Sequence, residues 1–184
     1  MIRFVARLTS RTIVLLCLGT TLALTSYAAY RYRFRIHAII WHARHGDSIL
    51  LGAYRIPVPS PWFVKEASSN EAQIWNAETG EIMLVRARPW PTVIDLDLWT
   101  GIENKMQDPQ FVILARRKLQ VGGESVVCLE KDLGTSVQSI TIHLPGVNCI
   151  SAGQLEIQLF GGTHAAPRYD YSEFYGLVSS IRKN

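Results

Sequence analysis

The chain has 184 residues, with 19 Lys or Arg against 15 Asp or Glu, three Cys and a formal net charge of +4. Beyond an apolar stretch near its start, about 140 residues suffice for one domain whose core needs neither a metal nor many disulfides. The first 45 residues hold seven Arg and no acid, whereas the rest carries more acidic than basic side chains. The mildly acidic domain has no basic stripe, so we expect no nucleic-acid partner.

The apolar stretch is residues 12–29, TIVLLCLGTTLALTSYAA, which contain no charged side chain and follow Arg3, Arg7 and Arg11. A membrane-crossing helix needs about 20 apolar residues, with about 17 as the lower limit. We therefore interpret residues 1–11 as a basic N-terminal tail and residues 12–29 as an uncleaved single-pass anchor in the cytoplasmic (inner) membrane. A signal peptide cleaved after Ala28 is the alternative.

Residues 30–46 form a basic, aromatic juxtamembrane connector. Aromatic or apolar residues alternate with Arg31, Arg33 and Arg35, which favours an extended segment from Tyr30 to Ile36. Helical spacing returns from Ile36 to Ala43, so a helix that continues from the membrane stays open. We expect the three arginines to contact lipid headgroups at the membrane interface. Arginines on both sides of the anchor leave the topology undecided by charge alone.

His37, His42 and His45, together with Asp47, form the densest titratable cluster of the sequence. A metal or haem at the membrane surface is conceivable, but this spacing matches no ligand signature. We interpret the three histidines as part of an interfacial segment and predict neither a metal nor a cofactor.

Residues 47–184 are predicted to fold as one globular α+β domain. Ser48–Val58 is predicted as one strand, and Ala72–Asn76 and Glu81–Arg88 as a hairpin with apolar residues on both faces, typical of a sheet covered on both sides. Thr92–Met106 has a capping box and an apolar stripe, which predict a helix. A second helix is predicted from Asp108 to Lys118, although a strand at Phe111–Leu114 is the alternative.

The C-terminal part is predicted as strands followed by one helix. The turn Gly122-Gly123 favours a hairpin between Leu119–Val121 and Ser125–Glu130. Further strands are predicted at Val137–Leu144 and at Gln154–Phe160, where clean alternation indicates a half-exposed antiparallel strand. A last helix, Tyr171–Ile181, is predicted to begin at Asp170.

Cys128 and Cys149 are the two cysteines of the domain, the first in a predicted strand and the second in a predicted loop. Their spacing fits neither a CxxC redox motif nor a zinc pair. We predict a structural disulfide worth roughly 3 kcal/mol. A disulfide places the domain on the extracytoplasmic (periplasmic) side of the membrane. Two unrelated buried thiols are the alternative.

Candidate chemistry is sparse. Asp95 and Asp97 lie two residues apart, where helical side chains diverge, so we interpret them as helix-start residues and predict no catalytic residue. Trp62 and Trp90 lie beside prolines and could form a ligand or glycan platform. Such residues more often close the core, which is the interpretation that we favour.

The two ends of the domain resemble a known family. Tyr54-Arg55-Ile56-Pro57-Val58-Pro59 followed by Trp62 is similar to the opening strand and corner of PsbP-like domains, and Tyr171–Ile181 is similar to their closing helix. The resemblance implies an α-β-α sandwich around an antiparallel sheet. It also implies an extracytoplasmic accessory or assembly factor without catalysis, and it transfers no functional residue.

We therefore predict a membrane-anchored, extracytoplasmic, non-enzymatic accessory or binding module with a protein partner at the membrane. The motivation is the anchor, the mildly acidic domain and the lack of a recognisable catalytic motif. Two alternatives stay open. The first is an exported hydrolase whose site assembles only in the fold, and the second is a ligand or glycan sensor that uses Trp62 and Trp90.

Overall fold

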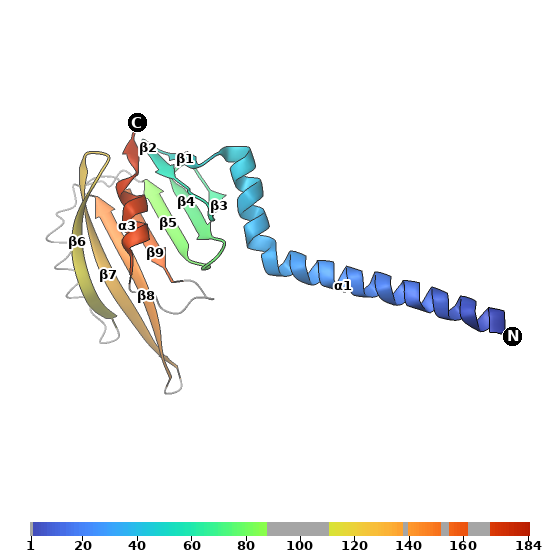
Figure 1. Ribbon diagram of the computed structural model, residues 1–184. Coiled ribbons are helices and arrows are strands. Elements are labelled where there is room, and N and C mark those ends of the chain that lie inside the picture. Colours follow the sequence, from blue (N-terminus) through green and yellow to red (C-terminus); the bar gives the residue numbers. More distant parts are fainter. Residues whose placement is uncertain (1, 88–110, 138–139, 152–154, 162–169) are drawn as a thin grey trace.

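The computed structural model describes residues 2–87, 111–137, 140–151, 155–161 and 170–184 (Figure 1). The helices are α1 (Ile2–His45) and α3 (Ser172–Ser179). The strands are β1 (Ser48–Leu51), β2 (Tyr54–Pro57), β3 (Trp62–Ala67), β4 (Glu71–Asn76), β5 (Ile82–Ala87), β6 (Phe111–Val121), β7 (Glu124–Val137), β8 (Ile140–Ser151), β9 (Leu155–Phe160) and β10 (Arg182–Lys183).

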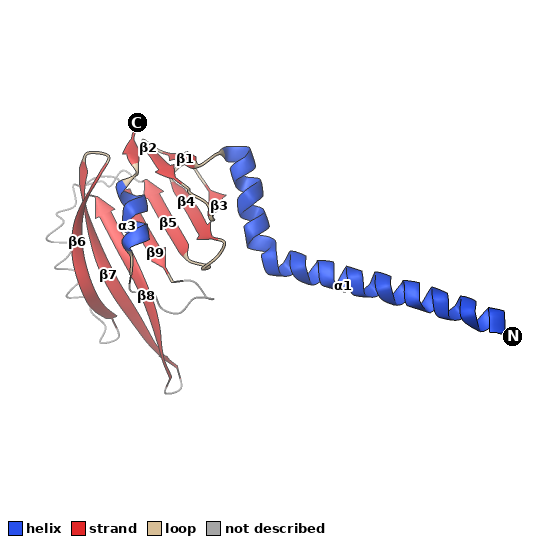
Figure 2. Cartoon of the chain, viewed as in Figure 1, coloured by secondary structure: helices blue, strands red, loops and turns tan. Residues whose placement is uncertain are grey.

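The strands form two antiparallel sheets (Figure 2). Seven strands make the large sheet in the order β3-β4-β5-β9-β8-β7-β6, and three make a small sheet in the order β1-β2-β10. The predicted α+β class with an antiparallel sheet and one long N-terminal apolar helix is confirmed. The predicted helix Thr92–Met106, with Asp95 and Asp97, lies outside the described residues.

The main apolar cluster lies on one face of the large sheet, where α3 and the small sheet pack against it (Figure 1). Alternate residues of β4, β5 and β9 are buried on this face, because successive side chains of a strand point to opposite sides. Ile74, Val85 and Ile157 have no exposed surface there. Phe174 and Val178 of α3 lie four residues apart on one helix face and are buried with them.

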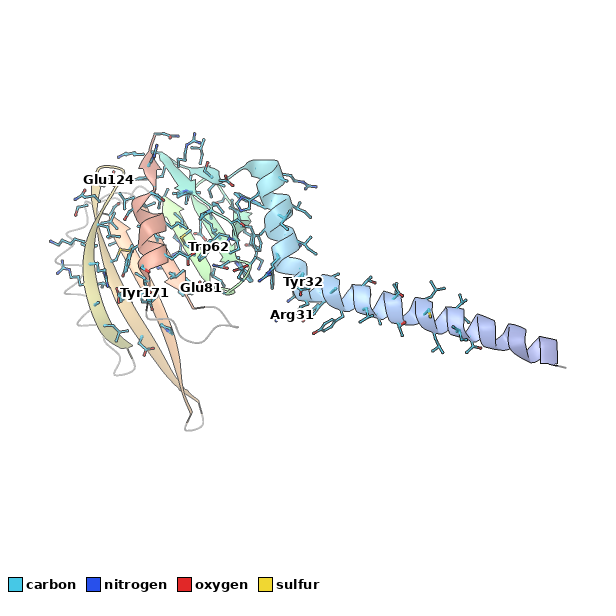
Figure 3. The ribbon with its side chains drawn as sticks, viewed as in Figure 1. Arg31, Tyr32, Trp62, Glu81, Glu124 and Tyr171 are labelled. Atoms are coloured by element: carbon cyan, nitrogen blue, oxygen red, sulfur yellow. A yellow bond between two sulfur atoms is a disulfide. The ribbon has the colours of Figure 1, made fainter. Side chains whose placement is uncertain are left out.

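Helix α1 corrects the expectation of an extended connector, because residues 30–36 belong to one continuous helix of 44 residues. The period of two in this segment does not decide its structure, since every residue there is also compatible with a helix and the flanking residues are helical. The helix bends near Arg31 and Tyr32, and its last turns pack along β3 (Figures 1 and 3).

The single strand predicted over Ser48–Val58 is wrong, because the chain reverses at Gly52 and pairs Ile49 with Ile56. Gly52 has a φ of +57°, a left-handed conformation that suits this turn. The strand alternative at Phe111–Leu114 replaces the predicted second helix, since β6 pairs with β7 along almost its whole length. Cross-strand pairing there outweighs the local helical signal.

The hairpin of β7 and β8 is also longer than predicted. Strand β7 continues to Val137, and β8 begins at Ile140 rather than at Val137. Cys149 therefore lies within β8, directly opposite Cys128 of β7, and not in a loop. The predicted hairpin across Gly122-Gly123 and the half-exposed strand β9 are both present.

Candidate functional site

The last turns of α1 pack on the outer edge of the large sheet. Phe34 stacks on Phe63 of β3 with ring centroids 6.5 Å apart and lies 5.8 Å from the ring of Trp75 in β4. Ala38, one turn further along, is 3% exposed. Arg35 forms an ion pair with Glu78 in the β4–β5 turn, at 3.2 Å. The juxtamembrane segment, residues 32–45, is thus part of the domain rather than a loose linker.

His42 fixes the end of this segment through both ring nitrogens. Nδ1 lies 2.9 Å from Asp47 Oδ1 and 3.1 Å from the carbonyl oxygen of Gly46, and Nε2 lies 2.8 Å from the carbonyl oxygen of Trp62. All three neighbours are oxygen acceptors, so each ring nitrogen faces a group of the protein itself. Neither nitrogen is free to bind a metal or to act as a general base.

The other two histidines of the predicted cluster are not brought together with His42 around one point. His45 Nδ1 lies 3.0 Å from the carbonyl oxygen of Trp41, and its ring stacks on the Trp41 ring. His37 lies against Phe63, with ring centroids 6.1 Å apart. Within the described ranges, no group of three or more His, Cys, Asp or Glu could hold a metal ion.

The residues predicted at the membrane interface surround the bend of α1. Arg31, Arg33 and Arg35 are exposed. The Arg33 guanidinium lies over the Tyr30 ring, 4.4 Å from its centroid. Guanidinium groups and tyrosine rings are the side chains that settle at the boundary between water and lipid. Residues 12–30, on the N-terminal side of the bend, are exposed along the whole helix.

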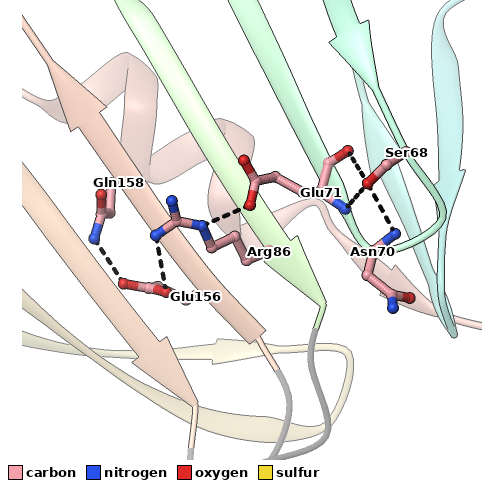
Figure 4. Close-up of polar contacts among 6 residues, drawn as sticks. All are labelled: Ser68, Asn70, Glu71, Arg86, Glu156 and Gln158. Carbon is pink, nitrogen blue, oxygen red and sulfur yellow. Dashed lines mark hydrogen bonds and ion pairs between the residues drawn. The ribbon is translucent and has the colours of Figure 1, made fainter.

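The half-buried face of the large sheet carries a polar row of Glu71, Arg86, Glu156 and Gln158 (Figure 4). Arg86 lies between two carboxylates: its Nε donates to Glu71 Oε2 at 2.9 Å, and its Nη1 lies 3.6 Å from Glu156 Oε2. The hydrogen bond to Glu71 raises the pKa of Arg86 further above its usual range. Two carboxylates against one guanidinium leave the polar row with an acidic excess.

A pocket with a volume of about 500 Å³ adjoins this row at the β3–β4 turn. We call this pocket the β3–β4 hollow. It is lined by Glu66, Ala67, Ser68, Ser69, Asn70, Glu71 and Gln73. The Ser68 hydroxyl accepts hydrogen bonds from the backbone N–H of Asn70 and of Glu71, which holds the turn in place (Figure 4). The lining contains no His, Cys or Lys, and it offers oxygen acceptors to a cationic or hydrogen-bond-donating group.

The polar row and the hollow are absent from the sequence-based predictions. Glu71 and Arg86 are directly opposite each other on β4 and β5. The predicted strand Ala72–Asn76 begins after Glu71, and both strands were predicted from their apolar residues. Glu156 comes from β9, seventy residues further along the chain, and reaches Arg86 only because β5 and β9 are neighbours in the sheet. Each hairpin strand supplies a single charged residue to the row, Glu71 in β4 and Arg86 in β5, so no repeating local pattern marked it.

Two further carboxylates tie the domain together rather than forming a site. Glu130 of β7 accepts hydrogen bonds from the Tyr175 hydroxyl at 2.7 Å and from Arg117 Nε at 2.9 Å. Burial and this hydrogen bond raise the pKa of Tyr175. Because one carboxylate serves both α3 and β6, it fixes the helix on the sheet.

Glu124, at the start of β7, fixes the C-terminal strand β10 to the domain in the same way. It accepts hydrogen bonds from Lys183 Nζ at 2.6 Å and from the Tyr54 hydroxyl at 3.0 Å. Burial raises the Glu124 pKa, but the hydrogen bonds from Lys183 and Tyr54 outweigh it, so the pKa is lowered. Burial and the same carboxylate raise the pKa of Tyr54.

Trp62 is 3% exposed and lies inside the domain (Figure 3). Its burial removes it from any exposed aromatic platform, so the sensor alternative that relied on Trp62 is wrong. Trp90, the second ring of that proposal, lies outside the described residues. The favoured interpretation of Trp62 as a core residue agrees with its position.

Cys128 and Cys149 are joined by a disulfide between β7 and β8, and both residues are fully buried. Cys17, on α1, is a free and exposed thiol. The disulfide lies in the core, away from the β3–β4 hollow, and the residues around it are apolar. Its position indicates a structural role.

Together these features define an antiparallel α+β domain carried on a long apolar helix. No family model matches the chain, and no curated protein matches it. Among solved structures, the fold is similar to that of PsbP (CyanoP) from the cyanobacterium Synechocystis sp. PCC 6803, with 16% identity, a TM-score of 0.45 and coverage of 72% of this chain and 87% of that one. A Bacteroides thetaiotaomicron protein matches with 9% identity and a TM-score of 0.40, over 75% of this chain and 48% of that protein.

Proposed function

We propose that this protein is a membrane-anchored, extracytoplasmic accessory module whose domain binds a protein partner at the surface of the membrane. The exposed apolar helix α1 carries the proposal. Thr12–His45 includes a window with a mean hydropathy of 1.7, and none of that window is buried against the domain. Leu15, Leu22 and Leu24 are 69%, 70% and 68% exposed. Such a surface is unstable in water and matches the interior of a bilayer.

The disulfide supports the extracytoplasmic side. Cytosolic thiols are kept reduced, and disulfides persist in oxidising compartments such as the periplasm. The Cys128–Cys149 bond contributes to the core and lies outside any redox motif, so a transient or catalytic bond is the less economical explanation.

An accessory role is supported by the contacts of His42 and Asp47, which join parts of the domain to one another. Within the residues that the structure describes, His42 and Asp47 form a His–carboxylate pair of the kind a hydrolase uses, and both ring nitrogens of His42 contact the protein itself. We assign the contact with the partner to the β3–β4 hollow. It is concave and polar, and it adjoins the acidic polar row, so a partner with basic side chains fits it.

The compartment is tested by mass spectrometry of the full-length protein, purified from membranes under thiol-blocking, non-reducing conditions. We expect an intact N-terminus and a Cys128–Cys149 peptide pair, with Cys17 alkylated after solubilisation. Protease applied to intact spheroplasts should degrade the domain. Free Cys128 and Cys149, or protection of the domain in intact spheroplasts, would contradict an extracytoplasmic location.

The accessory role is tested by native electrophoresis of membranes solubilised in mild detergent. We expect the chain to migrate in a complex larger than its own detergent micelle. A Glu66→Lys variant, which reverses one charge of the hollow, should release it from the complex. Glu173→Lys on α3 is the matched control and should leave the complex intact. Migration of the unaltered protein as a free chain would contradict the proposal.

A further inference from the structure

The juxtamembrane segment has an apolar face that the domain does not cover. We call it the isoleucine face: Tyr32, Ile36, Ile39, Ile40 and Ala43. Ile36, Ile39 and Ile40 are 43%, 69% and 46% exposed. At about 100° per residue, these positions lie opposite the face that packs on the domain. That opposite face consists of Phe34, Ala38 and Trp41.

Arginines border the isoleucine face on both sides. On the same helical spacing, Arg33 and Arg44 lie along one border and Arg35 along the other. Arg33 and Arg44 are exposed, and neither has an acidic residue within its own helix, since residues 1–46 contain no Asp or Glu. An apolar stripe edged by arginines is the pattern of a helix that lies in the interface of an anionic membrane.

The bend of α1 turns the isoleucine face toward one side. Figure 1 shows the domain on one side of the juxtamembrane segment, while the N-terminal part of α1 leaves toward the other. The face opposite the domain is therefore the face on the side of the spanning segment, residues 12–29. When these residues cross a bilayer, the isoleucine face is turned toward that same bilayer.

We propose that the juxtamembrane segment lies along the membrane surface, with Ile36, Ile39 and Ile40 at the boundary between headgroups and acyl chains. Arg33 and Arg44 would then bind the phosphates of anionic lipids. Because Phe34 and His42 fix this segment to β3, the edge of the large sheet rests on the membrane in one orientation. The inference rests on the proposed membrane anchoring and adds a second, peripheral contact to it.

Lipid fits this face better than a second copy of the chain. A second copy would bring the same arginines against one another, with no acidic residue among residues 1–46 to neutralise them. Anionic headgroups supply the missing negative charge, and they lie next to the point where the spanning segment ends.

The test places an environment-sensitive fluorophore at single cysteines of the full-length protein, in a Cys17→Ser background with the disulfide intact. The positions are Ile39→Cys on the isoleucine face, Leu22→Cys in the spanning segment and Leu114→Cys on β6. Leu114 is 45% exposed and lies at the far edge of the large sheet from β3. Nanodiscs that hold one copy contain equal parts of phosphatidylglycerol and phosphatidylcholine, with or without a lipid-attached quencher.

In nanodiscs, we expect the label at residue 39 to be several times brighter than the label at residue 114. We also expect the lipid-attached quencher to quench the label at residue 39. The label at Leu114 should stay dim and unquenched. In pure phosphatidylcholine, or in an Arg33→Gln and Arg44→Gln variant, the quenching at residue 39 should fall while that at residue 22 is unchanged.

Two results would overturn the inference. One is a label at residue 39 that stays unquenched in single-copy nanodiscs although residue 22 is quenched. The other is a label at residue 39 that becomes bright only when two copies share a disc, which would assign the face to a second copy. An unquenched label at residue 22 would instead contradict the membrane anchor. The label at residue 22 therefore tests the proposed function, and the label at residue 39 tests the peripheral contact.

Discussion

Removing the disulfide should weaken the domain by a large fraction of its stability. Cys128 and Cys149 are 21 residues apart in sequence. In the chain-entropy model, a bond that closes a loop of this length destabilises the unfolded chain by about 3 kcal/mol. Small domains are stable by about 5 to 15 kcal/mol in total. Because the two residues face each other in the β7–β8 ladder, the reduced protein keeps its strand pairing and loses mainly this entropic term.

Urea unfolding, followed by tryptophan fluorescence in detergent, measures the loss. A Cys128→Ala and Cys149→Ala variant should unfold at lower urea with a free energy reduced by about 3 kcal/mol, or slightly more, since both side chains are fully buried. Cys17→Ser is the control, because this exposed thiol lies on α1 outside the core. A loss below about 1 kcal/mol would refute the argument that the bond restricts the unfolded chain.

Three further changes test the packing of the domain. Gly122→Ala should cost about 1 to 3 kcal/mol in urea unfolding, because φ is +56° and a Cβ would lie 2.9 Å from the backbone nitrogen of Lys183. Raising the pH above about 10 should destabilise the domain by up to about 1.4 kcal/mol per pH unit for each of Tyr54 and Tyr175. Their raised pKa values keep the phenols protonated in the folded state while the unfolded chain loses the protons. Phe34→Ala should release the juxtamembrane segment, seen as faster amide hydrogen exchange in residues 33–45.

Each of these has a matched control and a contrary outcome. Gly123→Ala also has a positive φ but no atom within 4 Å of the added Cβ, so an equal loss at both glycines would rule out the clash. Replacing Tyr54 and Tyr175 by Phe should remove most of the loss of unfolding free energy above a pH of about 10. An unchanged dependence on pH would mean that other groups cause the loss. Ile39→Ala, in detergent, should leave hydrogen exchange unaltered, and unchanged exchange in Phe34→Ala would mean that the ring contacts do not hold the helix.

The juxtamembrane segment shows where local pattern stops being decisive. The alternation of Arg31, Arg33 and Arg35 with apolar residues fits a strand, yet a helix places the same residues on separate faces. The choice depends on contacts with Phe63 and Trp75, which lie on strands that the sequence does not pair with this segment. Helical stability in proteins comes largely from such packing.

The strands β6 and β8 illustrate the same limit. The glycine pair at 122–123 identified the hairpin of β6 and β7, because a tight turn needs residues that tolerate positive φ. How far each strand continues was set by pairing with its neighbour, so β6 replaced a predicted helix and β8 extended to include Cys149.

By itself, the sequence determined the apolar span, the location of the basic charge, the α+β class and the cysteine pair. Each of these depends on composition or on short-range periodicity, which burial and membrane thickness impose directly. Only the tertiary structure decided the bend of α1, the burial of Trp62, the polar row and the uncovered isoleucine face. These depend on which distant strands become neighbours, as Glu156 and Arg86 do, and long-range pairing leaves no local signal in the chain.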